Sequence, residues 1–136
     1  MFASLVGFFL LMFCLGLGFH SELRFFNAFI LLFFMYRDIR AWYLSHPESI
    51  DNYLSGVTQG MGAAVIGVVG FTVFMILFLW MNPVFMDTLR QNSQVGEYLG
   101  PFTASIIILI EGVATSLIGS YILTRILIMN IKKQPV

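Results

Sequence analysis

The chain has 136 residues, of which 59% are hydrophobic, 16% aromatic and only 10% charged. So few charged side chains cannot cover a water-exposed globular surface of this size, which excludes an ordinary soluble domain. Seven basic residues are balanced by seven acidic ones, so a strongly basic surface for nucleic acid or anionic lipid is excluded as well.

Four long apolar runs account for most of the chain and predict helices at about residues 2–19, 23–42, 54–81 and 101–130. A membrane crossing takes roughly 20 apolar residues. The runs therefore predict an all-α polytopic membrane protein with four transmembrane helices in an antiparallel bundle. Short connections leave no room for a separate soluble domain, and we expect a single domain over residues 1–136.

The first run could be read as a secretory signal peptide or as a retained helix. It lacks a basic start and a small-x-small cleavage site before the polar turn, so we expect a retained helix. Cys14, the single cysteine, lies inside this run and cannot form an internal disulfide. We interpret it as a small packing residue.

The second run lies between Arg24 and Arg37. Its uninterrupted apolar part is about 18 Å long, which is short for a crossing. Trp42 and Tyr43 follow, and these residue types favour the depth of the lipid headgroups. Arg37 and Arg40 are predicted to contact headgroups by extending their side chains out of the hydrocarbon.

The third run contains no charge before Asp87 and ends at the Asn82-Pro83 pair, because a proline cannot continue a helix. A polar loop is expected from Asp87 to Gly100. Pro101 is well placed in the first turn of the last helix, where its missing N–H costs nothing.

The distribution of basic residues predicts the orientation. Four crossings place both termini and the connection after the second helix on one side of the membrane. That side holds Arg37, Arg40, Arg125, Lys132 and Lys133, and the opposite side holds Arg24 and Arg90. Because short cytoplasmic segments are enriched in Lys and Arg, both termini are predicted to be cytoplasmic. Arg125, one turn from the membrane exit, is expected to reach the lipid headgroups.

Small residues predict where helices touch, because lipid tails are as apolar as leucine and close association depends on small side chains. The predicted packing residues are Gly56, Gly60, Ala64 and Gly67 in the third helix and Gly112, Ser116 and Ser120 in the fourth. We expect these two helices to be antiparallel neighbours. The first two helices are rich in phenylalanine instead, a surface suited to lipid or to the helices of a partner.

Glu111 lies about eleven residues into the last helix, close to the expected membrane midplane. A carboxyl group there costs about 2.5 to 3.5 kcal/mol on insertion scales, so it should face protein or water. It either handles a proton or cation, or meets a cationic group of another subunit, or is a neutral acid bonded to a backbone carbonyl or to hydroxyls such as Thr72 or Thr115. Gln59 is expected to cap the third helix or tie it to the fourth near Arg125.

No catalytic, cofactor or metal site is predicted. His20 and His46 fall on opposite membrane sides, and neither has a serine or cysteine nucleophile beside it in a recognisable motif. Gly16-Leu17-Gly18 is not a phosphate loop, because no strand precedes it. We expect a protein without enzymatic activity and without a cofactor.

Three segments carry a family resemblance: Tyr36 to Arg40, Tyr53 to Gly60, and Trp80 to Pro83. They resemble an uncharacterised four-helix family of Gram-negative inner-membrane proteins, in which a basic segment leads into a Ser-, Gly- and Gln-containing third helix that ends in an Asp-Pro pair. Here Asn82 replaces the acid, and the loop before the last helix is shorter and less charged. The resemblance implies the topology and a location in the bacterial inner (cytoplasmic) membrane, and no activity.

Two functions remain open from the sequence. The first is an accessory or structural subunit whose partners are the lipid bilayer and other integral membrane subunits. The second is a small homo-oligomeric transporter or channel component using Glu111. Small multidrug transporters also pair four helices with one buried glutamate, but theirs lies in the first helix. Since the other crossings supply no second acid, the subunit is favoured.

Overall fold

The computed structural model describes residues 1–17 and 21–133, with the side chains of residues 21–24 outside that description. The described residues form helices and no strand, so the expected all-α class is confirmed. In chain order the elements are α1 (Phe2–Cys14), α2 (Ser21–Ser45), η1 (Pro47–Ser49), α3 (Tyr53–Met81), α4 (Pro83–Asn92), η2 (Gly96–Tyr98) and α5 (Pro101–Lys133).

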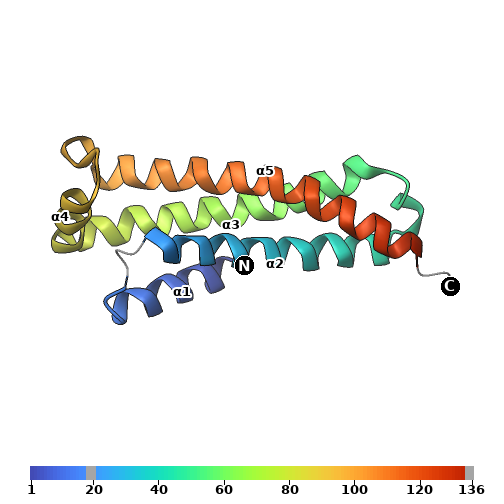
Figure 1. The fold of residues 1–136 in the computed structure, drawn as a ribbon, viewed down its shortest axis with the longest axis horizontal. Helices are drawn as coiled ribbons and strands as arrows, with labels where there is room; N and C mark the ends of the chain where they lie inside the picture. Colours follow the sequence, from blue (N-terminus) through green and yellow to red (C-terminus); the bar gives the residue numbers. More distant parts are fainter. Residues whose placement is uncertain (18–20, 134–136) are drawn as a thin grey trace.

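Three long helices, α2, α3 and α5, lie side by side and form an elongated bundle (Figure 1). Their 25, 29 and 33 residues correspond to about 37, 43 and 50 Å at 1.5 Å per residue. Consecutive long helices run in opposite directions. The bundle has two distinct ends: one is covered by α4 and η2, and the other holds η1 and the last turn of α5 (Figure 1).

Helix α1 is shorter than the predicted helix over residues 2–19. It ends at Cys14 because Gly16 adopts a left-handed conformation (φ 70°), which favours glycine. The N–H of Leu17 donates to the Met12 carbonyl and that of Gly16 to the Phe13 carbonyl, both at 3.0 Å, which is the Schellman pattern of a helix end. The predicted residues 18 and 19 lie outside the described residues. At about 20 Å, α1 covers only part of the bundle length (Figure 1).

The expected loop after residue 87 is partly helical. Asn82 ends α3, and its side-chain nitrogen donates to the Phe78 carbonyl at 3.0 Å. Pro83 then begins α4 at a position where no backbone donor is needed. Phe85 and Met86 on α4 are buried, so this short helix is held against the bundle by apolar packing.

Two of the described helices, α3 and α5, are long and apolar enough to cross a membrane. The core helix of a soluble protein can pass the same test, but such a helix is mostly buried. Only 39% of the most apolar stretch of α3 and 17% of that of α5 are buried inside the bundle. Helices α1 and α2 are not both long and apolar enough by the same test. Length and composition therefore support two of the four predicted crossings.

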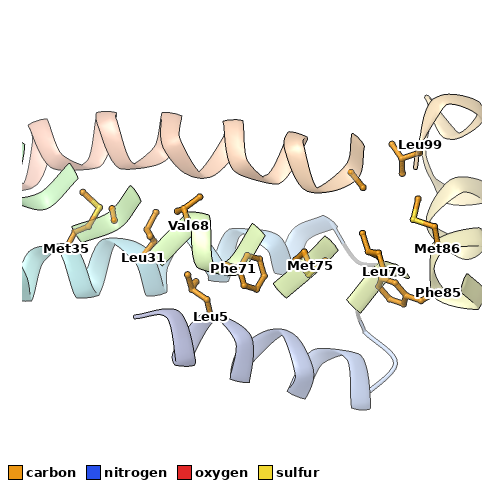
Figure 2. Packing of buried hydrophobic residues seen from close by; sticks show 12 residues of the cluster. Leu5, Leu31, Met35, Val68, Phe71, Met75, Leu79, Phe85, Met86 and Leu99 are labelled. Carbon is orange, nitrogen blue, oxygen red and sulfur yellow. The ribbon is translucent and has the colours of Figure 1, made fainter. Parts of the chain in front are cut away.

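The hydrophobic core follows α3 through the bundle, as Figure 2 shows. Its buried members are Leu5, Leu31, Met35, Ala64, Val68, Phe71, Met75, Leu79, Phe85, Met86, Leu99 and Ala104. Leu5 points from α1 into the bundle (Figure 2). A smaller cluster of Ile39, Tyr43 and Leu127 continues the packing toward η1.

The phenylalanines of the first two helices behave differently from one another. Phe9 of α1 packs edge to face on Phe78, with ring centroids 5.0 Å apart and an interplanar angle of 88°. In α2, by contrast, Phe25, Phe29 and Phe33 are exposed. The expectation of an outward aromatic surface therefore fits α2 better than α1. Cys14, interpreted as a packing residue, is exposed.

Candidate functional site

The outer surface of the bundle is apolar, whereas several small polar residues lie inside it. Phe29 on α2 is 67% exposed and Ile66 on α3 is 76% exposed. Ser116, Ser120 and Thr124 on α5 are completely buried. Soluble monomers rarely expose large contiguous apolar patches. Such a surface is suited to contact with lipid or with the apolar helices of another protein.

Helices α3 and α5 approach each other through their small residues. Three pairs define the register: Gly56 with Thr124, Gly60 with Ser120, and Gly112 with Val68. A β-carbon placed on Gly112 would lie only 2.6 Å from Cγ1 of Val68, so a larger residue requires the neighbour to move. Ala64 and Ser116 lie in the same register and are fully buried.

Two serine hydroxyl groups at this contact donate to their own helix, whereas Thr124 Oγ1 is buried and has no hydrogen-bond partner among the described residues. Ser116 Oγ donates to the Gly112 carbonyl at 2.6 Å, and Ser120 Oγ to the Leu117 carbonyl at 2.8 Å. Because these protons are directed to the backbone, the two helices associate there through close packing.

Two of the predicted packing glycines contact α2 as well as α5. A β-carbon on Gly60 would meet Ile39 of α2 at 2.6 Å, and Gly56 faces the Tyr43 ring. Gly67 lies against the Met1 side chain beside α1 and is therefore outside the α3–α5 contact. All these residues were predicted to lie in the contact of one helix pair, whereas the structure divides them among three neighbours of α3.

Glu111 lies near the middle of the bundle. In the register above it is level with Val69, and α3 extends from Tyr53 to Met81. The two hydroxyls named as candidate partners donate to backbone carbonyls: Thr115 to that of Glu111 at 2.8 Å, and Thr72 to that of Val68 at 2.8 Å. The Glu111 side chain is exposed in the isolated chain and lines a cavity.

This cavity has a volume of about 440 Å³ and lies between the α4 end of the bundle and its middle. Its walls come from α1, α2, α3, α4 and α5 and are mainly apolar. Asn27 and Glu111 line it toward the middle, and Asn92 and Ser93 toward the α4 end. Its size falls in the range of roughly 300–1,000 Å³ that is usual for small-molecule sites.

Two hydrogen bonds that were not predicted from the sequence join the helices at the η1 end. Trp42 Nε1 donates to Ser55 Oγ at 3.0 Å, which ties α2 to α3. Tyr53 Oη donates to the Tyr121 carbonyl at 2.7 Å, which ties α3 to α5. In the sequence, only the aromatic residues beside the polar loop hinted at these bonds, because each donor and its acceptor lie on different helices.

An ion pair links the last turn of α5 to the segment between η1 and α3 at the same end. Lys132 Nζ lies 2.8 Å from Asp51 Oδ1, and both side chains are exposed. The hydrogen bond and the charge of the ammonium group lower the pKa of Asp51 below its usual value.

The remaining predicted residues lie toward this end. Gln59 is half-buried in α3, and the contact predicted for it with the region of Arg125 stays a prediction. Arg37, Arg40 and Arg125 are exposed, so their side chains are accessible to lipid headgroups or water. At the opposite end, Arg90 Nε donates to the Leu99 carbonyl at 2.7 Å and holds the segment after α4 in place.

Among the described residues, no group of three or more His, Cys, Asp or Glu side chains is placed to hold a metal ion. Comparison of the chain with protein-family models, curated proteins and solved structures found no match. The resemblance to the four-helix inner-membrane family therefore stays a prediction.

Proposed function

We propose that this chain is an integral membrane protein whose helices α1, α2, α3 and α5 lie in the bilayer as an antiparallel bundle. The observation that carries the proposal is the outward direction of large apolar side chains along α2, α3 and α5, combined with buried serine and threonine. Each of these three helices is longer than the hydrocarbon thickness of about 30 Å. Helix α1 fills one part of the bundle within that thickness.

The η1 end is proposed to face the cytoplasm of a bacterial cell, with the end of α5 on that side. The predicted position of the N-terminus on the same side is not kept, because Met1 packs on Gly67 near the middle of the bundle (Figure 1). Lys132 and Lys133 close α5 there, and Arg37 and Arg40 lie toward the same end of α2. Arg90 is the basic residue of α4 at the opposite end. This distribution supports the orientation because Lys and Arg are enriched in short cytoplasmic segments.

Within the membrane, the chain is proposed to act as a non-catalytic accessory or structural subunit of a larger membrane complex. The exposed phenylalanines of α2, at positions 25, 29 and 33, are four residues apart and so lie on one face of the helix. A bundle that presents such a face can hold a helix of another subunit.

Native copurification tests this proposal. The protein is extracted from membranes in a mild detergent, and its stoichiometric partners are identified. Replacing Phe29 and Phe33 with alanine should release the partner while leaving the protein in the membrane. The matched control replaces Ile66 and Leu77 of α3, which are equally exposed apolar residues. Recovery of the wild-type protein alone would refute the subunit function, and equal loss of partner in both variants would refute the α2 face as the contact surface.

A second candidate is a small homo-oligomeric transporter or channel component. The cavity that Glu111 lines near mid-bundle favours it. In proteoliposomes, this candidate predicts a proton flux driven by a membrane potential, which Glu111→Gln should stop. The subunit function predicts instead that Glu111→Gln weakens assembly with a partner and that the wild-type protein alone carries no flux.

A further inference from the structure

The cavity extends along the bundle from its middle, where Asn27 and Glu111 line it, to the α4 end, where Asn92 and Ser93 line it. Between Ala104 and Thr115, the α5 residues that line it rise about 16 Å along the helix, close to the length of an extended alkyl chain of about twelve carbons. Phe71 and Met75 of α3 form much of one wall, and Leu5 and Phe9 of α1 contribute another. An elongated apolar space of this kind fits one alkyl chain and not the two chains of a phospholipid.

The helices stay apart here because of where their small residues lie. Gly119 of α5 lets Leu32 and Met35 of α2 approach closely in the half of the bundle near η1. Toward α4 the facing residues of α5 are Ile107 and Ile108, which are too large for the same approach. Close packing in one half therefore leaves a space in the other.

Asn27 gives the cavity a polar feature at its mid-bundle end. Its side-chain oxygen is buried and has no hydrogen-bond partner among the described residues. Buried acceptors are nearly always satisfied, so the group calls for a donor. Glu111 lines the same end of the cavity, whereas most of the remaining lining is apolar. An organic molecule with a donating head can therefore bond to Asn27 while its alkyl part fills the apolar volume.

We propose that the cavity binds a single-chain amphiphile whose polar end donates a hydrogen bond to Asn27 Oδ1 and whose alkyl chain extends along α3 toward α4. The chemical class is an alkyl chain with a hydroxyl or similar donating head. The ligand reaches the site from the bilayer, so its route, though not the binding itself, rests on the proposed membrane location.

Photolabelling in nanodiscs of phosphatidylcholine tests the proposal. The probe is a dodecanol analogue with a diazirine at the end of its alkyl chain, and unmodified dodecanol and dodecane are the competitors. We expect saturable labelling near the α4 end of the cavity, around Leu99 and Ala104, which dodecanol suppresses at lower concentration than dodecane.

Three variants define the site. Asn27→Leu removes the acceptor and should weaken competition by dodecanol about fivefold, the usual loss for one hydrogen bond, without changing competition by dodecane. Ala104→Phe fills the cavity and should abolish saturable labelling. Ala114→Phe adds the same volume on the exposed face of α5 and should change nothing.

Labelling that does not saturate, or that is equal in the Ala104→Phe and Ala114→Phe variants, overturns the proposal. If dodecanol suppresses labelling of Asn27→Leu as effectively as that of the wild-type protein, the assignment of the polar end is refuted. This test does not depend on whether Ala104→Phe folds. Membrane location is measured separately by carbonate extraction. A protein that stays in the membrane pellet but shows no saturable labelling refutes the ligand alone, whereas release by carbonate refutes the location.

Discussion

Gly60 of α3 faces Ser120 of α5 so closely that a β-carbon on Gly60 would lie 3.5 Å from the Ser120 Cβ. The same β-carbon would lie 2.6 Å from Cδ1 of Ile39 in α2. Three long helices therefore converge on one glycine. This contact, more than any polar interaction, fixes the distance between the helices in the half of the bundle near η1.

Enlarging Gly60 should destabilise the bundle. Gly60→Leu forces both neighbours apart and should lower the unfolding free energy by about 1–3 kcal/mol, the range for overpacked cores. Gly60→Ala should cost less because the nearest atom is the flexible end of Ile39. Thermal unfolding in detergent measures the change. Gly62→Leu is the control, since nothing lies within 4 Å of its β-carbon position. Equal loss in both leucine variants would contradict the packing described above.

Removing the ring of Phe9 should loosen α1. The ring packs against Phe78 and against Phe71, Phe74 and Phe85. Phe9→Ala should cost about 2 kcal/mol, less than for a fully buried ring because Phe9 is only partly buried. Hydrogen exchange of the α1 amides should accelerate, while exchange in α5 stays unchanged. Phe25→Ala, which alters an exposed ring, should leave α1 protected.

The pKa of Asp51 should depend on Lys132. Since the folded-state pKa lies below the usual value, the stabilisation by this pair is present above that usual value and is lost as the pH falls through the lowered one. Both groups are exposed, so the effect is small and salt weakens it. An NMR titration of Asp51 should show a normal pKa in Lys132→Met and a lowered one in Lys133→Met. An unchanged pKa in Lys132→Met would argue against the pair.

The long helices are the part of the fold that local sequence signals predict well. Helix α3 begins one residue before the expected start at 54, and it ends at Met81 as expected. The reason is local, because Pro83 cannot continue the helix whatever surrounds it. The close approach of α3 and α5 also has a sequence signal, since small residues repeat at a spacing of four.

Other features depend on contacts between distant segments and leave little local signal. Helix α4 has the composition of a polar loop, yet burial of Phe85 and Met86 holds it in place. Gly67 packs on Met1 at a sequence separation that no periodicity reveals. The cavity forms where five helices do not pack fully against one another, which no local pattern predicts. In the sequence, Asn27 is only one polar residue within an apolar run.

The central claim is that the outer faces of the bundle are surrounded by lipid, and spin-label accessibility tests it most directly. A label is attached at Ile66, after Cys14 is replaced by serine, in protein reconstituted into liposomes. Collisions with oxygen, which dissolves in the hydrocarbon, should be frequent, and collisions with a water-soluble nickel complex should be rare. A label at Glu48 in η1, at the end of the bundle, should give the reverse. Frequent collisions of the nickel complex with the label at Ile66 would contradict the claim.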